Sequence, residues 1–311
     1  MIELVPYDPI WRSRFEHEAR ALRTAFGALA CRIEHVGSTA VPGLIAKPVI
    51  DIQVSVESLA SFAPFLSVMS SLGYEHLPDA DPVFERSYPY FHKPAEWPHS
   101  HHVHLCEDGS LAELKHIAFR DRLRADAQTR TTYASLKREL AGRHGSSTHE
   151  ERQRYSDGKT EFIRSALAVP TFLEEFSRWT AGRPEILSAA LVGSHSRGTA
   201  TPDSDVDLVI LCNMPQDLLA GDWQKRFGDV ASLRIEDYGA LKSLRVRYRG
   251  GLEVEFGFAL PSWAKLPLDA STRAVLADGA CILYDPSRVL HAARRAALGT
   301  TPASDLPKAE R

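Results

Sequence analysis

A glycine-serine pair followed by two alternating aspartates constrains the fold of this chain more than any other feature. Gly193-Ser194 ends one short apolar run, and Asp205 and Asp207 open the next. The second run, Val206 to Leu211, is short and rich in β-branched residues, which predicts a buried strand, and residues 186–192 are expected to form another strand that ends at the Gly-Ser turn. Because side chains two residues apart in a strand point to the same side, the two carboxylates are expected to face one point.

This combination of groups indicates phosphate chemistry. Asp205 and Asp207 together suit Mg²⁺, since a hard cation prefers anionic oxygen ligands. The backbone N–H groups at Gly193 and the hydroxyl of Ser194 can donate hydrogen bonds to a phosphate. An isolated Asp-x-Asp or Gly-Ser is common in solvated turns, so the prediction rests on their order between two strands.

Residues 186–211 resemble the signature of the DNA polymerase β-type nucleotidyltransferase superfamily. They are similar above all to its minimal bacterial and antibiotic-modifying members, which carry Gly-Ser-x-x-Arg-Gly before Ser-Asp-x-Asp-Leu. The resemblance covers about 170–290. It implies transfer of a nucleoside monophosphate from an NTP, with ATP as the expected nucleotide and Mg²⁺ as the cofactor. Arg197 of the motif is expected to help Gly193 and Ser194 grip the phosphates, with a surface arginine as the alternative.

The resemblance also implies a third carboxylate on a neighbouring strand. Two alternating segments around a Gly-Gly turn predict a hairpin. A three-residue loop sets Arg245 opposite Glu255 and Arg247 opposite Glu253, which separates charged from apolar side chains, whereas a two-residue loop mixes them. We favour Glu255 as the third metal ligand and as the base that activates the attacking hydroxyl, because it lies farther from the turn. Glu253 stays open, as does a purely cross-strand role for both glutamates.

The N-terminal half contains a second Gly-Ser turn. Gly37-Ser38 follows an apolar segment and precedes residues 47–56, in which apolar and polar residues alternate; this predicts a half-buried strand that carries Asp51. The string around them is similar to the GrpB-like family, and the similarity covers about 3–168. This resemblance implies the same superfamily but no particular reaction. Its further motifs are Tyr7-Asp8-Pro9-x-Trp11 and Phe119-Arg120-Asp121-x-Leu123-Arg124.

The N-terminal site is expected to bind an anion. Lys47 is placed to neutralise a phosphate, and His102 and His104 share a strand face that suits phosphate or substrate contacts. A hydrogen-bonded structural strand and a metal site stay open as alternatives for the histidines. Gln53 stands where a second aspartate is expected after Asp51, so this half is predicted to bind a phosphate-bearing ligand weakly and without turnover.

Composition sets modest bounds. The chain has 311 residues, 44% hydrophobic residues, 25% charged residues and a net charge of −3, which predicts about two globular domains and no general nucleic-acid binding. No secretory signal or membrane-spanning run is evident, and the four cysteines are widely separated, so a cytoplasmic protein is expected. The expected partners are a nucleotide and a small-molecule or macromolecular hydroxyl acceptor.

The predicted fold class is α/β (α+β), with two nucleotidyltransferase-like domains that each have a small mixed sheet flanked by helices. The domains are a GrpB-like domain at 1–168, a nucleotidyltransferase domain at 169–296 and a flexible tail at 297–311. Val169-Pro170 is expected to end a helix at the boundary. Two alternatives to a metabolic transferase stay open: a nucleotide-binding regulatory protein with degenerate folds, and a toxin–antitoxin-type transferase acting on protein or tRNA.

Overall fold

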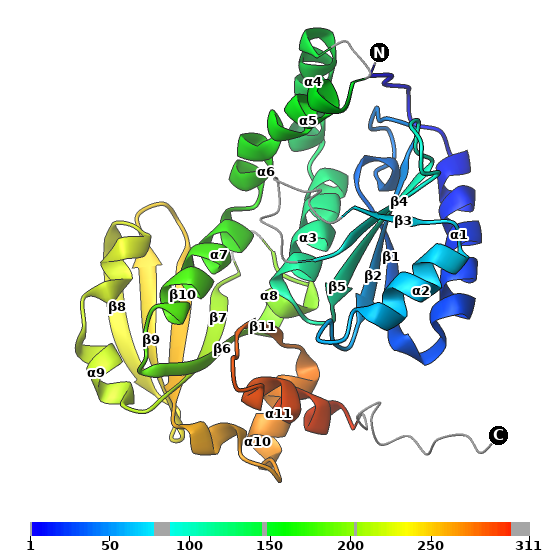
Figure 1. Ribbon diagram of the computed structural model, residues 1–311. Coiled ribbons are helices and arrows are strands. Elements are labelled where there is room, and N and C mark those ends of the chain that lie inside the picture. The colour runs from blue at the N-terminus through cyan, green and yellow to red at the C-terminus, as the bar shows by residue number, and fades with distance from the viewer. Residues whose placement is uncertain (1, 78–87, 145–147, 202–203, 300–311) are drawn as a thin grey trace, which may run out of the picture. The chain divides into compact units, whose positions relative to one another are not determined.

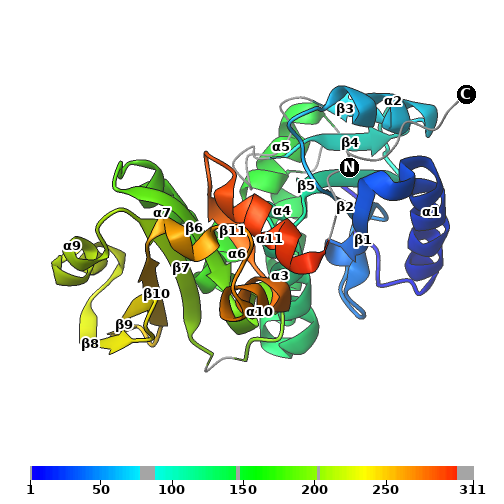
Figure 2. The same ribbon diagram turned by 90° about the horizontal axis from the view of Figure 1, so that it is seen from below.

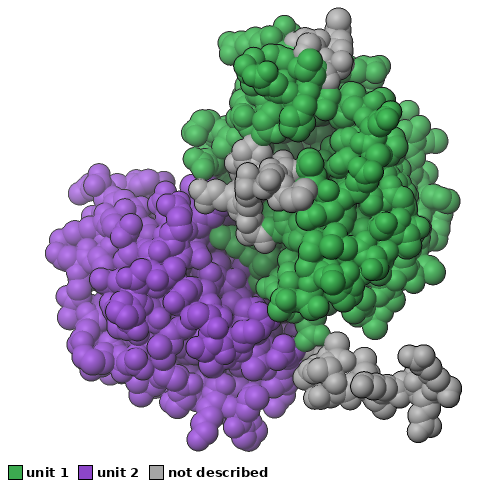
Figure 3. All heavy atoms as spheres, viewed as in Figure 1, with its two compact units in different colours: residues 1–168 green, residues 169–311 purple. Residues whose placement is uncertain are grey.

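The computed structural model is an α/β protein with two mixed sheets, each flanked by helices (Figure 1). The chain divides into two compact units, 1–168 and 169–311 (Figure 3). None of the described helices is long and apolar enough to cross a membrane. The predicted tail lies outside the described residues from position 300 onward. The structure describes residues 2–77, 88–144, 148–201 and 204–299.

The first unit contains a five-stranded sheet in the order β1-β2-β5-β4-β3. Strands β2 and β5 run parallel, and the other neighbours are antiparallel. Its elements are α1 (Ile10–Phe26), β1 (Ala30–Val36), β2 (Ile50–Val56), α2 (Ala63–Ser71), β3 (Glu75–Leu77), β4 (Tyr90–Lys93), β5 (His101–Glu107), α3 (Leu111–Ala125), α4 (Ala127–Arg143), α5 (His149–Asp157) and α6 (Thr160–Ala166).

One face of this sheet is the apolar core of the unit. Ile50, Ile52 and Val54 of β2 are fully buried, and they pack in one cluster with Trp11 and Leu22 of α1. Helix α2 joins the same cluster, so α1 and α2 cover this face (Figure 1). The predicted alternation of β2 is therefore confirmed on its apolar side.

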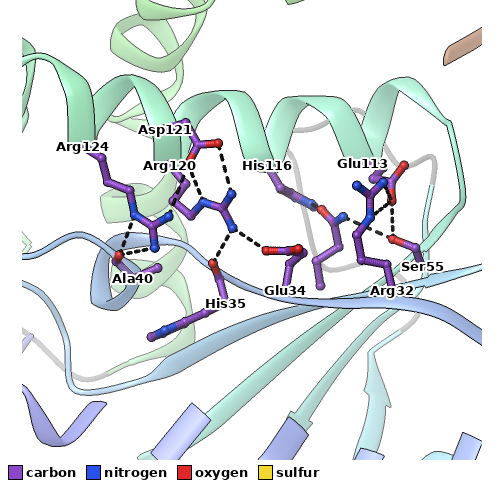
Figure 4. Close-up of polar contacts among 11 residues, drawn as sticks. Arg32, Glu34, His35, Ala40, Ser55, Glu113, His116, Arg120, Asp121 and Arg124 are labelled. Atoms are coloured by element: carbon purple, nitrogen blue, oxygen red, sulfur yellow. Dashed lines mark hydrogen bonds and ion pairs between the residues drawn. The ribbon is translucent and has the colours of Figure 1, made fainter. Parts of the chain in front are cut away.

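The opposite face of β2 is polar and also buried, which corrects the expectation of a half-buried strand. Gln53 and Ser55 are completely inaccessible to solvent. Helix α3 covers them, and its side chains supply hydrogen-bond partners (Figure 4). Burial of polar groups is tolerated here because nearly every donor meets an acceptor.

Charged residues link α3 to the strands beneath it. Glu113, which is only 3% exposed, accepts hydrogen bonds from Arg32 of β1 and, at 2.5 Å, from Ser55 of β2. Farther along the helix, Arg120 donates to Glu34 at 2.7 Å and to the carbonyl oxygen of His35 at 3.1 Å (Figure 4). These paired charges attach α3 to the sheet and leave its C-terminal half above the end of β1.

The second unit contains a six-stranded sheet in the order β11-β6-β7-β10-β9-β8. Strands β7 and β10 run parallel, and the other neighbours are antiparallel. Its elements are α7 (Ala168–Ala181), β6 (Ile186–Val192), α8 (Gly193–Arg197), β7 (Val206–Cys212), α9 (Pro215–Ala220), β8 (Val230–Asp237), β9 (Leu241–Tyr248), β10 (Glu253–Ala259), α10 (Ala270–Asp278), β11 (Cys281–Tyr284) and α11 (Val289–Leu298).

Helices cover both faces of the second sheet. On one face, Phe172 and Phe176 of α7 pack against Phe256 of β10 with ring centroids 6.2 and 5.8 Å apart. Helices α10 and α11 pack together beside β6 (Figure 2), and their Leu276 and Leu290 belong to the core cluster of the other face. The two predicted strands, β6 and β7, are thus neighbours within a sheet that helices cover on both faces.

Two local predictions have different outcomes. The hairpin register is confirmed, because Arg245 pairs with Glu255 and Arg247 pairs with Glu253 across β9 and β10. The expected helix break lies earlier than Val169-Pro170: α6 ends at Ala166, and α7 begins at Ala168 and contains the proline. Proline is compatible with the first turn of a helix, where its missing N–H has no intrahelical acceptor to lose.

Candidate functional site

Three carboxylates converge at one end of the second sheet. Asp207 of β7 lies directly beside Glu255 of the parallel strand β10, and Asp205 immediately precedes β7. One oxygen of each carboxylate lies within 4.8 Å of the others, and all three side chains are partly exposed. Among the described residues, this is the group of acidic, histidine or cysteine side chains with a geometry that suits one metal ion.

The negative charges of its neighbours act on Asp207. Burial, together with the negative charges of Asp205 and Glu255, raises the pKa of Asp207 to about 6. Like charges this close disfavour ionisation unless a cation compensates them. The arrangement is therefore one that a divalent cation stabilises, and oxygen donors are the ligands that Mg²⁺ prefers.

Gly193 permits the turn to approach these carboxylates. Its backbone has φ +69°, and a Cβ atom built there overlaps the carboxylate of Asp207. Only glycine tolerates both conditions without strain. Ser194 follows in the first turn of α8, partly exposed. Arg197, at the end of α8, pairs with Asp278, so the structure places its guanidinium on a partner outside the carboxylate group.

Arg245 is a functional residue that the sequence analysis assigned only to hairpin pairing. Its guanidinium donates hydrogen bonds to Asp205 and to Glu255, and its Nε lies 3.2 Å from Glu236. Burial works against the charged form, but these carboxylates outweigh it and raise the Arg245 pKa above its ordinary value. Arg245 therefore forms ion pairs with two of the three carboxylates, and its single positive charge offsets part of their negative charge.

The two candidate glutamates occupy different environments. Glu255 belongs to the carboxylate group and accepts a hydrogen bond from the hydroxyl of Ser243 at 2.6 Å. Glu253 lies one strand repeat closer to the turn and accepts from Arg247 at 2.6 Å. The geometry favours Glu255 as the third metal ligand.

The first unit has a cavity of about 210 Å³ at the corresponding end of its sheet. All six residues that the sequence analysis proposed for this half line it, although they come from three separate segments. These are Gly37, Ser38, Lys47, Asp51, His102 and His104.

Asp51 lies at the base of this cavity. Its carboxylate is hydrogen bonded to Nδ1 of His102 at 3.1 Å, and Nε2 of His104 lies 3.9 Å away. Burial alone raises a carboxyl pKa, but the two histidines hold the Asp51 pKa well below its usual range. A Cβ atom at Gly37, whose φ is +66°, overlaps Asp51 as one at Gly193 overlaps Asp207.

Gln53 does not occupy the position of a second metal carboxylate, which corrects its interpretation. Its side-chain oxygen is hydrogen bonded to Nδ1 of His116 at 3.0 Å, and its amide nitrogen donates to Ser55 at 3.3 Å. Asp51 corresponds to Asp207, because each lies opposite the residue before its Gly-Ser turn. The residue that corresponds to Asp205 therefore precedes Asp51 and is not Gln53.

Replacing Gln53 with alanine is expected to lower the free energy of unfolding by about 2–4 kcal/mol. The variant loses two buried hydrogen bonds and leaves His116 without its acceptor. Chemical denaturation measures the change, with the exposed Gln128→Ala on α4 as the control. A loss below 0.5 kcal/mol, as at ordinary surface sites, contradicts this structural role.

Further cavity groups, which the sequence patterns did not identify, reach the first cavity from the helices. Lys137 of α4 and Lys159, just before α6, line it together with Tyr133 and Tyr155. Lys137 is 2% exposed, and its ammonium donates to Ser38 at 3.0 Å. Lys137 is spaced along α4 so that it shares a helix face with the buried Tyr133 and Leu140. This spacing is the sequence signal that could have identified it as a buried lysine.

Family models match the two units of the chain separately. The family model described as "GrpB protein" matches residues 1–168, more than half of the chain. This chain belongs to the GrpB family. A model described as "Nucleotidyltransferase domain" matches residues 170–249, so the GrpB domain is followed by a nucleotidyltransferase domain of polymerase β type.

Individual GrpB relatives show the same extent of similarity. UPF0157 protein YqkA of Bacillus subtilis is 34% identical over 182 residues, which cover 58% of this chain and 49% of YqkA. UPF0157 protein BH1888 of Halalkalibacterium halodurans is 34% identical over 53% of this chain and 80% of its own. The match thus spans about half the length of YqkA.

Two further comparisons involve a structure and a larger protein. The crystal structure of GrpB from Enterococcus faecalis has 33% identity and a TM-score of 0.47, over 54% of this chain and 96% of that one. A protein named dephospho-CoA kinase from Mycolicibacterium paratuberculosis is 37% identical over 159 residues, which cover 44% of this chain and 39% of the kinase.

Proposed function

We propose that the second unit is a Mg²⁺-dependent nucleotidyltransferase that moves a nucleoside monophosphate from an NTP, ATP in the first instance, to a hydroxyl acceptor. The observation that carries this proposal is the group of three carboxylates, Asp205, Asp207 and Glu255, on adjoining strands beside a glycine turn. The nucleotidyltransferase domain match supports it independently.

The donor set fits the metal. Asp205, Asp207 and Glu255 would hold Mg²⁺ through carboxylate oxygens, and the raised pKa of Asp207 indicates a charge excess that a cation relieves. When bound, the ion supplies positive charge for the triphosphate and for the pyrophosphate that leaves.

The remaining chemistry belongs to the side chains. The acceptor oxygen attacks the α-phosphorus, the bond from that phosphorus to the bridging oxygen breaks, and pyrophosphate departs. The acceptor's proton passes to a carboxylate, for which we propose Glu255, because the hydroxyl of Ser243 orients it at 2.6 Å. Gly193 allows the turn to lie close enough for its N–H groups and Ser194 to contact the phosphates.

Arg245 favours a second candidate function. Its ion pairs with Asp205 and Glu255 offset part of the negative charge of the group without a metal, which suits a nucleotide-binding regulatory unit that has lost turnover. In the transferase, by contrast, Arg245 must exchange these partners when the metal and triphosphate bind. The two functions differ in whether nucleotide binding leads to pyrophosphate release.

Release of pyrophosphate from ATP, measured with a coupled assay across a panel of hydroxyl acceptors, tests the proposal. We expect release that requires Mg²⁺ and stops when EDTA is in excess. Nucleotide binding by calorimetry without pyrophosphate release from any NTP tested would support the regulatory function instead.

We propose an accessory or substrate-binding role for the first unit. Its five strands repeat the order and directions of β6-β7-β10-β9-β8, without a counterpart of the edge strand β11, which supports a nucleotidyltransferase-like fold. Among the described residues, its cavity lacks a group of three carboxylates.

A further inference from the structure

The two sheets can be compared residue by residue. In both, the strand before the Gly-Ser turn lies antiparallel to a strand with an aspartate, and that strand is parallel to a third. Asp51 lies opposite Val36 as Asp207 lies opposite Val192. Positions in the first cavity therefore have defined counterparts in the carboxylate site.

Two of the three carboxylates have no counterpart in the first unit. His102 lies beside Asp51 in the register that Glu255 has beside Asp207. Val49, two residues before Asp51, stands in the position of Asp205. One carboxylate with an apolar neighbour and a histidine is a poor site for Mg²⁺, which demands oxygen ligands.

Positive charge gathers where the second unit has its carboxylates. Lys47, Lys137 and Lys159 line the cavity, and Asp51 is the acidic residue among its described lining. The ammonium groups lie over aromatic rings, with Lys47 and Lys159 at 5.0 and 4.8 Å from the centroid of Tyr155. Three lysines against one aspartate give the cavity an excess of positive charge when all three are protonated, as a bound anion favours.

Two polar groups in this cavity have no protein partner within the described parts of the chain. The ammonium of Lys47 contacts the rings of Trp97 and Tyr155 but forms no hydrogen bond or ion pair there. His104 is 9% exposed, and its Nδ1 has no hydrogen-bond partner. Buried polar groups are normally satisfied, so Nδ1 of His104, together with the half-buried ammonium of Lys47 in the same cavity, indicates a missing ligand.

We propose that this cavity binds a phosphate dianion, either free or as the end of a small phosphomonoester, without a metal ion. The lysines supply the charge that Mg²⁺ supplies in the other unit, and Nδ1 of His104 can donate one hydrogen bond in the appropriate tautomer. The site lies within the first unit, so it does not depend on transfer by the second.

Isothermal titration of the full chain with inorganic phosphate in excess EDTA tests the site, because chelation removes any metal-dependent binding. We expect Lys47→Met and Lys137→Met each to weaken binding at least tenfold. The matched control is Lys93→Met, since Lys93 also lies over a tyrosine ring, at 4.7 Å from Tyr74, but outside the cavity. Its affinity should stay within twofold of the unmodified chain.

Lys159→Met is a second cavity variant for the case in which Lys137→Met does not fold. Lys159 is only partly buried, whereas Lys137 is fully buried. Titrations with AMP, sulfate and acetate identify the ligand class: AMP tighter than phosphate indicates a phosphomonoester, and phosphate tighter than AMP indicates the free ion. Unchanged phosphate affinity in Lys47→Met and Lys159→Met, equal binding of acetate, or no binding at millimolar phosphate would each overturn the proposal.

Proton uptake gives a second measurement on the unmodified chain. Burial, with repulsion from Lys159, lowers the pKa of both Lys47 and Lys137 to about 7, so at pH 8 both are largely neutral. A bound dianion favours their charged forms, and titration in buffers of different ionisation enthalpy should show net uptake at pH 8; release or no exchange contradicts the site. The titratable groups facing the ligand are Lys47, Lys137, Lys159, Asp51, His102, His104, His116, Tyr90, Tyr133 and Tyr155, with Arg152 acting on Lys47 from α5.

Discussion

Asp207→Asn should lower kcat for Mg²⁺-dependent pyrophosphate release by about 10³-fold, or about 4 kcal/mol. Asp207 lies beside Glu255 and near Asp205, so the substitution removes a central charge of the proposed metal site while keeping the side-chain shape. Steady-state kinetics at saturating Mg²⁺ measures the effect. The exposed Asp222→Asn serves as the matched control, with no expected change.

The same substitution should not destabilise the fold. The folded-state pKa of Asp207 is raised to about 6. Above that pH Asp207 is ionised, and its charge costs the native state more free energy than it costs the unfolded chain. Asparagine removes this repulsion, so the unfolding free energy at pH 8 should rise, on the order of 1 kcal/mol. Retention of more than a tenth of the wild-type kcat would show that Asp207 is not a metal ligand.

Gly193→Ala should lower kcat/KM by at least about 10²-fold. The new methyl group overlaps the Asp207 carboxylate, and the backbone φ of +69° is itself unfavourable for alanine. Either the turn or the aspartate must move, and both belong to the proposed site. Kinetics with ATP as the varied substrate measures the loss.

Gly198→Ala separates backbone strain from this overlap. Gly198 has nearly the same φ, +71°, but a Cβ atom there meets nothing within 4 Å. Backbone strain should therefore lower the unfolding free energy of both variants by a similar amount, roughly 1–2 kcal/mol. Only Gly193→Ala should also lose most of its activity. Equal kinetic losses in the two variants would refute the close approach of Gly193 to Asp207 as the cause.

Local patterns predicted the features that depend on neighbours in sequence. Alternation located β2, a short apolar run rich in β-branched residues located β7, and the separation of charged from apolar residues gave the correct pairing of Arg245 with Glu255. Such patterns report which side of a strand a residue faces, and a one-residue slip would reverse every face. The grouping of Asp205 and Asp207 with Glu255 followed from the family resemblance together with this register.

The same patterns were wrong about Gln53, because its role depends on a distant helix. Taken alone, β2 shows a polar face that suits solvent or metal, yet α3 covers this face and His116 is hydrogen bonded to Gln53 across 63 positions of sequence. Val49 is the residue that stands in the position of Asp205, and this correspondence follows only from the strand pairing of the two sheets.

The sequence by itself thus determined the two Gly-Ser turns, the aspartates that follow them and the strands that carry them. Only the tertiary structure decided what surrounds these groups: Arg245 between Asp205 and Glu255, and Lys137 within the first cavity. The physical reason is range. Alternation and turn chemistry are set by backbone geometry over a few residues, whereas the charge around a site depends on which distant elements pack beside it.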